Sequence, residues 1–304
     1  MWNRSEDGAF SRVESPVLAA CYRIREQLGT GAMGEVFLVE NIAAQRLEAL
    51  KILKKIEEPN AEREAQGRFK REVHAANRIA HENIVQTYDY GILPDGRMFL
   101  SMEYVMGTSL AALLYQRGPL PVGMALGILA ELGDALHYAH AAGVVHRDLK
   151  PANIILADHP RGKIVRVLDF GMAKILDTSF KESVLLSRDG MAFGTPAYMA
   201  PEQCVGKPPD PRSDIYALGC VAFELFTGEP PFRGALAPLF AAHIGKPPRK
   251  PSQLDPELPA AIDALVLRCL EKAPDQRFQT GGDLCAAAQS VPGYRPLRSF
   301  NPQV

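Results

Sequence analysis

The sequence predicts an α+β protein of two lobes, a small lobe with an antiparallel β-sheet and one main helix and a larger, mainly α-helical lobe. Up to about Glu103 the apolar residues fall in short strand-like runs around a single helical stretch, and beyond Gly107 their spacing becomes largely helical. A glycine-rich stretch separates the first two strand-like runs. With 304 residues, the chain is long enough for two modest lobes with substantial cores.

Composition and charge indicate an ordinary globular protein. The formal net charge of -1 gives no reason to expect nucleic acid or a membrane surface as a partner. Five cysteines are scattered without the spacing of metal ligands, which is typical of reduced thiols. The polar N-terminus lacks the apolar centre of a signal peptide. No apolar run reaches the roughly 18–20 residues that cross a bilayer, so we expect a soluble, cytoplasmic chain without a membrane segment.

Two strands between Tyr22 and about Asn41 flank the glycine-rich stretch. Three glycines let the backbone lie close over a ligand without obstruction by side chains. The Gly-x-Gly-x-x-Gly pattern alone is weak, because dinucleotide-binding folds share it. Here a strand begins again near Val36, whereas a dinucleotide fold requires a helix at that point. The stretch consists of Leu28, Gly29, Thr30, Gly31, Ala32, Met33, Gly34, Glu35 and Val36.

The next strand is Leu47–Leu53, followed by a helix over Arg63–Ala80. Strand side chains alternate between faces, so Ala49 and Lys51 point the same way, the small residue leaving room for a flat ring. Glu72 lies on the apolar side of the helix. Since a buried carboxylate is costly without a cation, we expect it to pair with Lys51. Taken alone, a lysine such as Lys51 is usually a solvated strand residue.

Two further strands, Ile84–Tyr90 and Arg97–Glu103, precede a helix over Pro121–Ala142. His137 and His140 in that helix have a spacing that could suggest a metal site, but no third ligand is evident and helix packing is the favoured interpretation. Farther on, a helix spans about Arg212–Gly228. The proline-rich stretch Lys246–Pro251 could bind a polyproline-recognising module, although an inter-helix loop is favoured.

The loop His146–Asn153 contains most of the polar side chains that point to a function. It places Asp148, Asn153 and, a short way on, Asp169 around one point, with Lys150 beside them. Carboxylate and amide oxygens suit Mg²⁺ that carries a phosphate. Pro151 keeps the segment in a loop. The short strands that aim Asn153 and Asp169 are Ile154–Leu156 and Ile164–Leu168.

Together these motifs resemble the eukaryotic-type (Hanks-type) serine/threonine protein kinases, most closely the bacterial members. The closing Gly194–Glu202 segment, with its Ala-Pro-Glu, resembles the end of their activation segment. The resemblance covers residues 22–289 and implies the bilobal protein-kinase fold. The implied divisions are an N-terminal tail 1–21, a small lobe 22–103, a hinge 104–107, a large lobe 108–289 and a C-terminal tail 290–304.

The resemblance implies an enzyme that uses ATP and Mg²⁺ to phosphorylate serine or threonine hydroxyls of protein substrates. Asp148 would accept or orient the hydroxyl, Lys150 would steady the phosphoryl group, and Lys51 would contact the phosphates. The catalytic set would be Asp148, Lys150, Lys51, Glu72, Asn153 and Asp169, with Asn153 and Asp169 as metal ligands. The nucleotide would contact Leu28, Gly29, Thr30, Gly31, Ala32, Met33, Gly34, Val36, Ala49, Lys51, Met102 as gatekeeper, Glu103 and Val105 through their backbones, and Ile155 as the floor.

Regulation is implied by Arg147, because kinases with arginine before the catalytic aspartate are commonly switched by phosphorylation of the activation segment. Met191 stands where many members carry the phosphorylated threonine, which leaves other acceptors, with Ser187 favoured. Autophosphorylation in trans through a transient dimer is expected. The matching cations are Arg68 and Lys174, the candidate acceptors are Thr178, Ser179, Ser183 and Ser187, and Glu202 should pair with Arg277.

Several alternatives stay open. A pseudokinase scaffold would lack a catalytic residue, yet the complete set is present. A small-molecule phosphotransferase of the antibiotic-kinase type shares the loop but lacks the Gly194–Glu202 segment. Lys150, two residues after the catalytic aspartate, resembles the serine/threonine rather than the tyrosine branch. Ser109 and Ala152 stand where arginine-directed kinases carry acids, so a strongly basic substrate motif is not expected.

Overall fold

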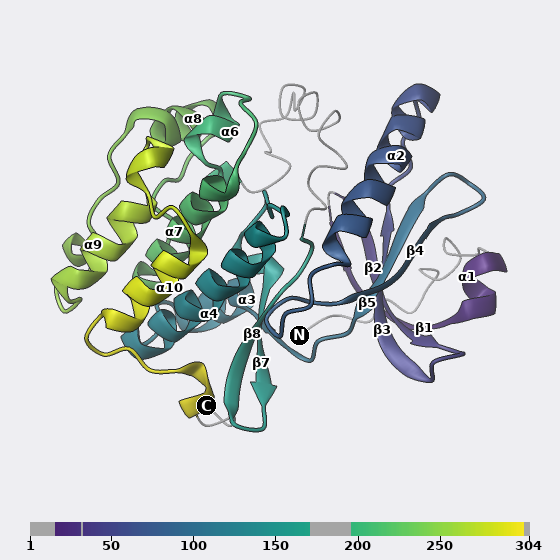
Figure 1. The fold of residues 1–304 in the computed structure, drawn as a ribbon, viewed down its shortest axis with the longest axis horizontal. Coiled ribbons are helices and arrows are strands. Elements are labelled where there is room, and N and C mark those ends of the chain that lie inside the picture. The colour runs from purple at the N-terminus through teal and green to yellow at the C-terminus, as the bar shows by residue number, and fades with distance from the viewer. Residues whose placement is uncertain (1–15, 32, 171–195, 301–304) are drawn as a thin grey trace. The chain divides into compact units, whose positions relative to one another are not determined.

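The computed structural model describes residues 16–31, 33–170 and 196–300, which form two compact units. One unit contains the described parts of Met1–Gln66 and Thr87–Tyr104, and the other contains those of Gly67–Gln86 and Val105–Val304. The first is a twisted sheet and the second is mainly helical (Figure 1). This confirms the predicted α+β class with a small sheet lobe and a larger helical lobe.

The first unit is built on a five-stranded antiparallel sheet with strand order β1-β2-β3-β5-β4. Its apolar side chains gather into one core that includes Phe37, Leu50 and Phe99. Leu18, from a short helix that the sequence did not predict, joins this core. The elements are α1 (Pro16–Cys21), β1 (Tyr22–Thr30), β2 (Gly34–Asn41), β3 (Arg46–Leu53), β4 (Thr87–Ile92) and β5 (Met98–Glu103).

Helix α2 (Pro59–Ala76) begins and ends about one turn earlier than the predicted Arg63–Ala80. The Glu58 carboxylate accepts hydrogen bonds from the first backbone N–H groups of the helix, and proline is well suited to the first helical position. These two features explain why the helix begins at Pro59 rather than at Arg63.

The predicted strand Ile84–Tyr90 also begins later, at Thr87. Ile84 instead forms an isolated parallel bridge with Val167 in the second unit. The Val85 N–H donates to the Val167 carbonyl, and the Val167 N–H donates to the Asn83 carbonyl. Residues 83–85 therefore bond to Val167, near the end of the stretch Ile164–Leu168, and do not take part in β4.

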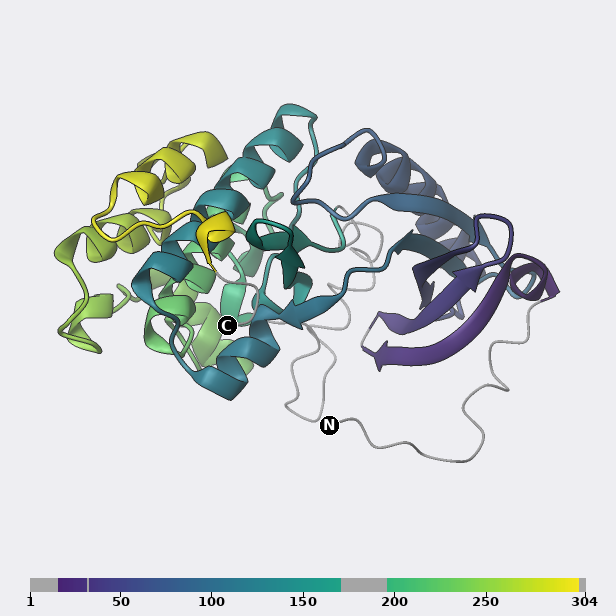
Figure 2. The ribbon, with the colours of Figure 1, turned by 90° about the horizontal axis from the view of Figure 1, so that it is seen from below.

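The second unit contains a three-stranded sheet, β6 (Gly107–Ser109), β7 (Ile154–His159) and β8 (Gly162–Val167), beside its helices. Helix α7 is buried over most of its length and packs against α4 and α9 (Figures 1 and 2). None of the described helices is long and apolar enough to cross a membrane. The helices are α3 (Leu110–Arg117), α4 (Val122–Ala141), α6 (Pro201–Cys204), α7 (Pro211–Thr227), α8 (Leu236–Gly245), α9 (Ala260–Cys269) and α10 (Gly281–Ser290), with short 3-10 turns η2 (Pro151–Asn153), η4 (Pro196–Tyr198), η5 (Pro251–Gln253), η6 (Pro274–Gln276) and η7 (Leu297–Ser299).

The segment Val291–Phe300, which we call the C-terminal arm, folds back from α10 along α4 to β8 (Figure 1). Leu297 in the arm is buried in the same core as α4 and α7. Three glycines lie directly under the arm: a Cβ atom on Gly123, Gly127 or Gly162 would come within 2.8 Å of an arm carbonyl oxygen. Part of the sequence expected as a tail is therefore packed into the second unit.

Candidate active site

The loop after α4 brings three of the predicted polar side chains together. Lys150 Nζ donates to Asp148 Oδ2 at 2.7 Å, and Asn153 Nδ2 donates to the Asp148 carbonyl oxygen at 2.8 Å and to Oδ2 at 3.3 Å. Because the Asn153 amide uses its nitrogen here, its Oδ1 is available to a cation. The Asp148 side chain is 27% exposed, so a substrate hydroxyl can reach it.

Asp214, a buried acid in the first turn of α7, holds the backbone of this loop. It accepts hydrogen bonds from the N–H groups of His146 and Arg147, each at 2.8 Å, and its Oδ2 lies 2.7 Å from His140 Nε2. Arg147 has a φ of 70°, a left-handed conformation that is costly for a residue other than glycine. The bonds to Asp214 offset that cost and fix the two residues that precede Asp148.

Asp169 follows β8 closely, and its neighbours on both sides are fixed. The Leu168 N–H donates to the Asn153 carbonyl at 2.9 Å, and the Leu168 carbonyl lies 2.9 Å from His146 Nε2. The Phe170 ring packs edge-on against the His146 imidazole, with 4.7 Å between the ring centroids. Asp169 itself has a φ of 60°, another strained conformation of the kind that gathers at functional sites. The backbones that carry Asn153 and Asp169 are thus directly linked.

In the first unit, β3 carries Ala49 and Lys51 on one face, as the alternation predicts. The register with β5 sets Ala49 opposite Met102 and Lys51 opposite Leu100, so these four side chains share that face. Ala49 and Lys51 are both largely buried. Glu72 is partly buried on α2 and belongs to the second unit, so its ion pair with Lys51 stays a prediction.

The three glycines where the chain passes from β1 to β2 have different surroundings. Among the described residues, no atom lies within 4 Å of a Cβ atom added to Gly29 or Gly31, which leaves space there for the predicted ligand. A Cβ atom on Gly34 would lie 2.0 Å from the Ile52 carbonyl oxygen, so β3 itself excludes a side chain there. Ala32 lies outside the described residues.

The other predicted nucleotide contacts are divided between the two units. A common adenine pocket therefore stays a prediction. Leu28, Thr30, Met33, Val36, Met102 and Glu103 belong to the first unit, and Val105 and Ile155 belong to the second.

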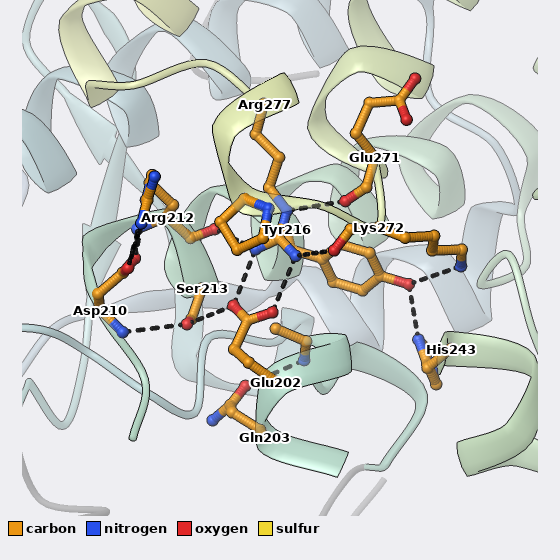
Figure 3. Close-up of polar contacts among 12 residues, drawn as sticks. Glu202, Gln203, Asp210, Arg212, Ser213, Tyr216, His243, Glu271, Lys272 and Arg277 are labelled. Atoms are coloured by element: carbon orange, nitrogen blue, oxygen red, sulfur yellow. Dashed lines mark hydrogen bonds and ion pairs between the residues drawn. The ribbon is translucent and has the colours of Figure 1, made fainter. Parts of the chain in front are cut away.

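The predicted pair of Glu202 and Arg277 is confirmed (Figure 3). Arg277 Nη1 and Nη2 donate to the two Glu202 oxygens at 2.8 Å each, and the remaining guanidinium hydrogens bond the backbone carbonyls of Arg212, Glu271 and Lys272. All five N–H donors of this buried side chain are used. Burial opposes ionisation of Glu202, but hydrogen bonds from Arg277 and Ser213 keep its pKa below the ordinary value.

The structure also shows the surroundings of three features that the sequence analysis discussed. His140 is bound to Asp214, and the described residues hold no group of three or more His, Cys, Asp or Glu side chains arranged for a metal. Ser109 caps α3 by accepting the Ala112 N–H at 3.2 Å. The stretch 246–250 is a connector between α8 and η5, which agrees with the favoured loop interpretation.

The predicted phosphorylation site cannot be placed, because the activation segment lies largely outside the described residues. The residues concerned are Lys174, Thr178, Ser179, Ser183, Ser187 and Met191.

Sequence reasoning missed the roles of two buried acids, Asp214 and Glu48. Each is a lone carboxylate next to apolar residues, at the start of an apolar run for Asp214 and within one for Glu48. A buried carboxylate requires donors, and each of the two has a donor from a segment distant in the sequence, His146 for Asp214 and Ser101 for Glu48. The sequence could therefore indicate that these two carboxylates matter, but it could not indicate which groups donate hydrogen bonds to them.

Residues 22–288 match the family described as "Protein kinase domain". The serine/threonine-protein kinase pkn3 of Myxococcus xanthus is 38% identical over 296 residues, which cover 93% of this chain and 53% of that protein. The serine/threonine-protein kinase PknE of Mycobacterium tuberculosis is 37% identical over 270 residues, which cover 89% of this chain and 46% of that protein. The chain thus spans about half the length of these curated relatives.

The solved structures agree. The crystal structure of the Mycobacterium tuberculosis PknI kinase domain superposes with a TM-score of 0.69 at 30% sequence identity. The match covers 89% of this chain and 96% of that one.

Proposed function

The chain belongs to the protein kinase family as a serine/threonine kinase domain of the bacterial type, and from this membership we propose that it phosphorylates serine or threonine hydroxyls of proteins with MgATP. The observation that carries the proposal is the bonded set of Asp148, Lys150 and Asn153 beside the strained Asp169. Acidic, cationic and amide groups in this arrangement suit phosphoryl transfer, in which positioning and charge neutralisation supply most of the catalysis.

Asp148 is assigned to the substrate hydroxyl. Its carboxylate orients the hydroxyl and takes its proton as the new O–P bond forms and the bond from the γ-phosphorus to the bridging oxygen breaks, releasing ADP. Lys150, already 2.7 Å from Asp148, places its positive charge where the transferred group gathers negative charge.

Asn153 and Asp169 are assigned to magnesium, which when bound would neutralise charge on the phosphates. Their hard oxygen atoms fit this ion, and the Asn153 amide already has its nitrogen turned toward Asp148. Lys51, which we expect to pair with Glu72, is assigned to the α and β phosphates. The space beside Gly29 and Gly31 suits a backbone that covers these phosphates.

The remaining assignments concern setting and partners. All five cysteines are free thiols, which supports a reducing, cytoplasmic location for this domain. Protein substrates are expected, including a second copy of the chain during autophosphorylation in trans.

The test is incubation of the purified chain with Mg²⁺ and labelled ATP, followed by phosphoamino-acid analysis. Label on serine or threonine is expected for the wild type. Asp148→Asn and Lys51→Met should fold normally and lose activity by about 10²–10³-fold, since each removes one preorganised charge.

Asp158→Asn is a matched control. Asp158 also pairs with a lysine, Lys163, at 2.6 Å, but on an exposed part of the β7–β8 hairpin. It should leave the rate unchanged. A wild-type rate in Asp148→Asn would refute the proposed reaction.

A further inference from the structure

A fully buried carboxylate lies within the sheet of the first unit. Glu48 Oε1 accepts hydrogen bonds from Asn41 Nδ2 at 3.0 Å and from Arg46 Nε at 2.7 Å, and its Oε2 accepts the hydroxyl of Ser101. The alternation of strand residues sets Glu48 on the face opposite to Ala49. A buried charge is tolerated only when donors surround it, and here they come from β2, β3 and β5. We call Glu48, Asn41, Arg46 and Ser101 the polar clamp.

The two outer strands also meet the clamp. Burial raises the pKa of Tyr22 on β1 to about 12, so its hydroxyl stays a donor, and it donates to Asp89 on β4 at 3.4 Å. The Arg46 guanidinium stacks on the Tyr88 ring with 3.5 Å to the centroid. Tyr88 falls at the irregularity in the β4–β5 register, where a bulge can redirect a side chain. Polar side chains from all five strands thus converge on one face.

The clamp lies at the end of β5 that is assigned to the purine base. The register sets Ser101 opposite Leu50, Met102 opposite Ala49, and Glu103 opposite Glu48. The bond from Ser101 to Glu48 therefore runs diagonally between β3 and β5, on the sheet face opposite to the Met102 side chain, and it ties the backbone just before Met102 and Glu103 to β3. The kinase strand motif Val-Ala-Ile-Lys carries an apolar residue where this chain has Glu48. Strand pairing alone would accept that apolar residue, so the charge calls for a separate explanation.

We propose that Glu48 is a positioning residue for the purine base, acting through Ser101 to hold Met102 and Glu103 in register with Ala49. The inference rests on the proposed function, because it assumes that ATP binds at this end of β5. Removing the bond would let the end of β5 shift. Binding of the correct base would weaken, while contacts to the phosphates would persist.

The experiment measures binding of MgATP and MgGTP to the whole chain by isothermal titration calorimetry. Ser101→Ala should weaken ATP binding about tenfold and leave GTP binding nearly unchanged, because a displacement of about 1 Å is enough to cost a well-oriented contact. Ser101→Cys, which fills nearly the same space with a weaker donor, should give an intermediate loss.

Ser213→Ala is the matched control. Ser213 is also buried and also donates to a glutamate, Glu202, at 2.6 Å, but in the second unit. It should keep the wild-type preference for ATP over GTP.

Three outcomes would overturn the inference. Unchanged ATP preference in both Ser101 variants would remove the positioning role and leave the proposed function intact. Equal losses for ATP and GTP, together with a lower urea midpoint, would show that the clamp only stabilises the sheet. Failure of the wild type to bind ATP would refute the proposed function itself, and the positioning role with it.

Discussion

Asp214 accepts the backbone N–H of Arg147 at 2.8 Å, although 67 positions separate the two residues in the sequence. One buried carboxylate on α7 thereby determines the conformation of the residue that precedes Asp148. Its other bonds, to the His146 N–H and to His140, leave no part of the carboxylate without a partner. The loop that carries Asp148 is thus fixed by a helix to which no reacting group is assigned.

Asp214→Asn should reduce kcat by roughly 10²-fold while the KM for ATP changes little, because the loop shifts but the strand residues assigned to ATP do not. The amide can satisfy only part of the three donors, so the free energy of unfolding should also fall, by about 2 kcal/mol. Steady-state kinetics and urea unfolding test both effects. A wild-type kcat in a folded Asp214→Asn variant would contradict the positioning argument.

The ion pair of Glu202 and Arg277 should appear in the pH dependence of stability. Because the pKa of Glu202 is lowered in the folded state, its contribution is complete above its ordinary value of 4.5 and is lost as the pH falls through the folded value. At pH 7 the free energy of unfolding of the wild type should be about 3 kcal/mol higher than that of Glu202→Gln, and this difference should shrink below about pH 4.5. Urea unfolding from pH 7 to 3 measures it.

Glu224→Gln provides a control of opposite sign. Burial raises the pKa of Glu224, which accepts the Tyr198 hydroxyl at 2.5 Å. The wild type should therefore gain stability relative to this variant as the pH falls toward 4.5. The same trend in both variants would refute the assignment of the two environments.

His243 should make the protein less stable below neutral pH. Burial, with help from the charge of Lys272, lowers the pKa of His243 from 6.5 to about 4, and its Nδ1 lies 2.9 Å from the Tyr216 hydroxyl oxygen. A lowered histidine pKa means that the unfolded chain binds the proton first, so stability is complete above pH 6.5 and declines toward pH 4.

Between pH 6.5 and pH 4 the free energy of unfolding should fall by about 3 kcal/mol more in the wild type than in His243→Gln, whose side chain cannot titrate. Urea unfolding at several pH values gives the slope. His137→Gln, which removes an exposed histidine from α4, should keep the wild-type slope. Equal slopes for the wild type and His243→Gln would contradict the prediction.

The C-terminal arm should contribute measurably to stability. Leu297→Ala removes a side chain that is 1% exposed, and it should lower the free energy of unfolding by about 2–4 kcal/mol. Arg298→Ala, next along the chain, breaks only a partly exposed ion pair with Glu82 and should cost less than about 1 kcal/mol. Chemical denaturation of the two variants separates burial from surface charge, and similar small losses would show that the arm is loosely attached.

The sequence predicted most of the strands, and the gathering of Asp148, Lys150 and Asn153, because these signals are local. The alternation around Lys51 and the polar residues from Asp148 to Asn153 can be read within a few positions of the sequence. The partners of Glu48 and Asp214 could not be read in this way, since they depend on contacts between distant segments. The same reason explains why residues 83–85 do not belong to β4, because they bond instead to Val167, which is distant in the sequence.

The C-terminal arm has a practical consequence for anyone who shortens the chain. A fragment that ends at residue 288, where the family match ends, would lack the arm, so Gly123, Gly127 and the apolar residues around Leu297 would become exposed to solvent. Newly bared apolar surface of this kind promotes self-association, so such a fragment should precipitate more readily than one that extends to Phe300.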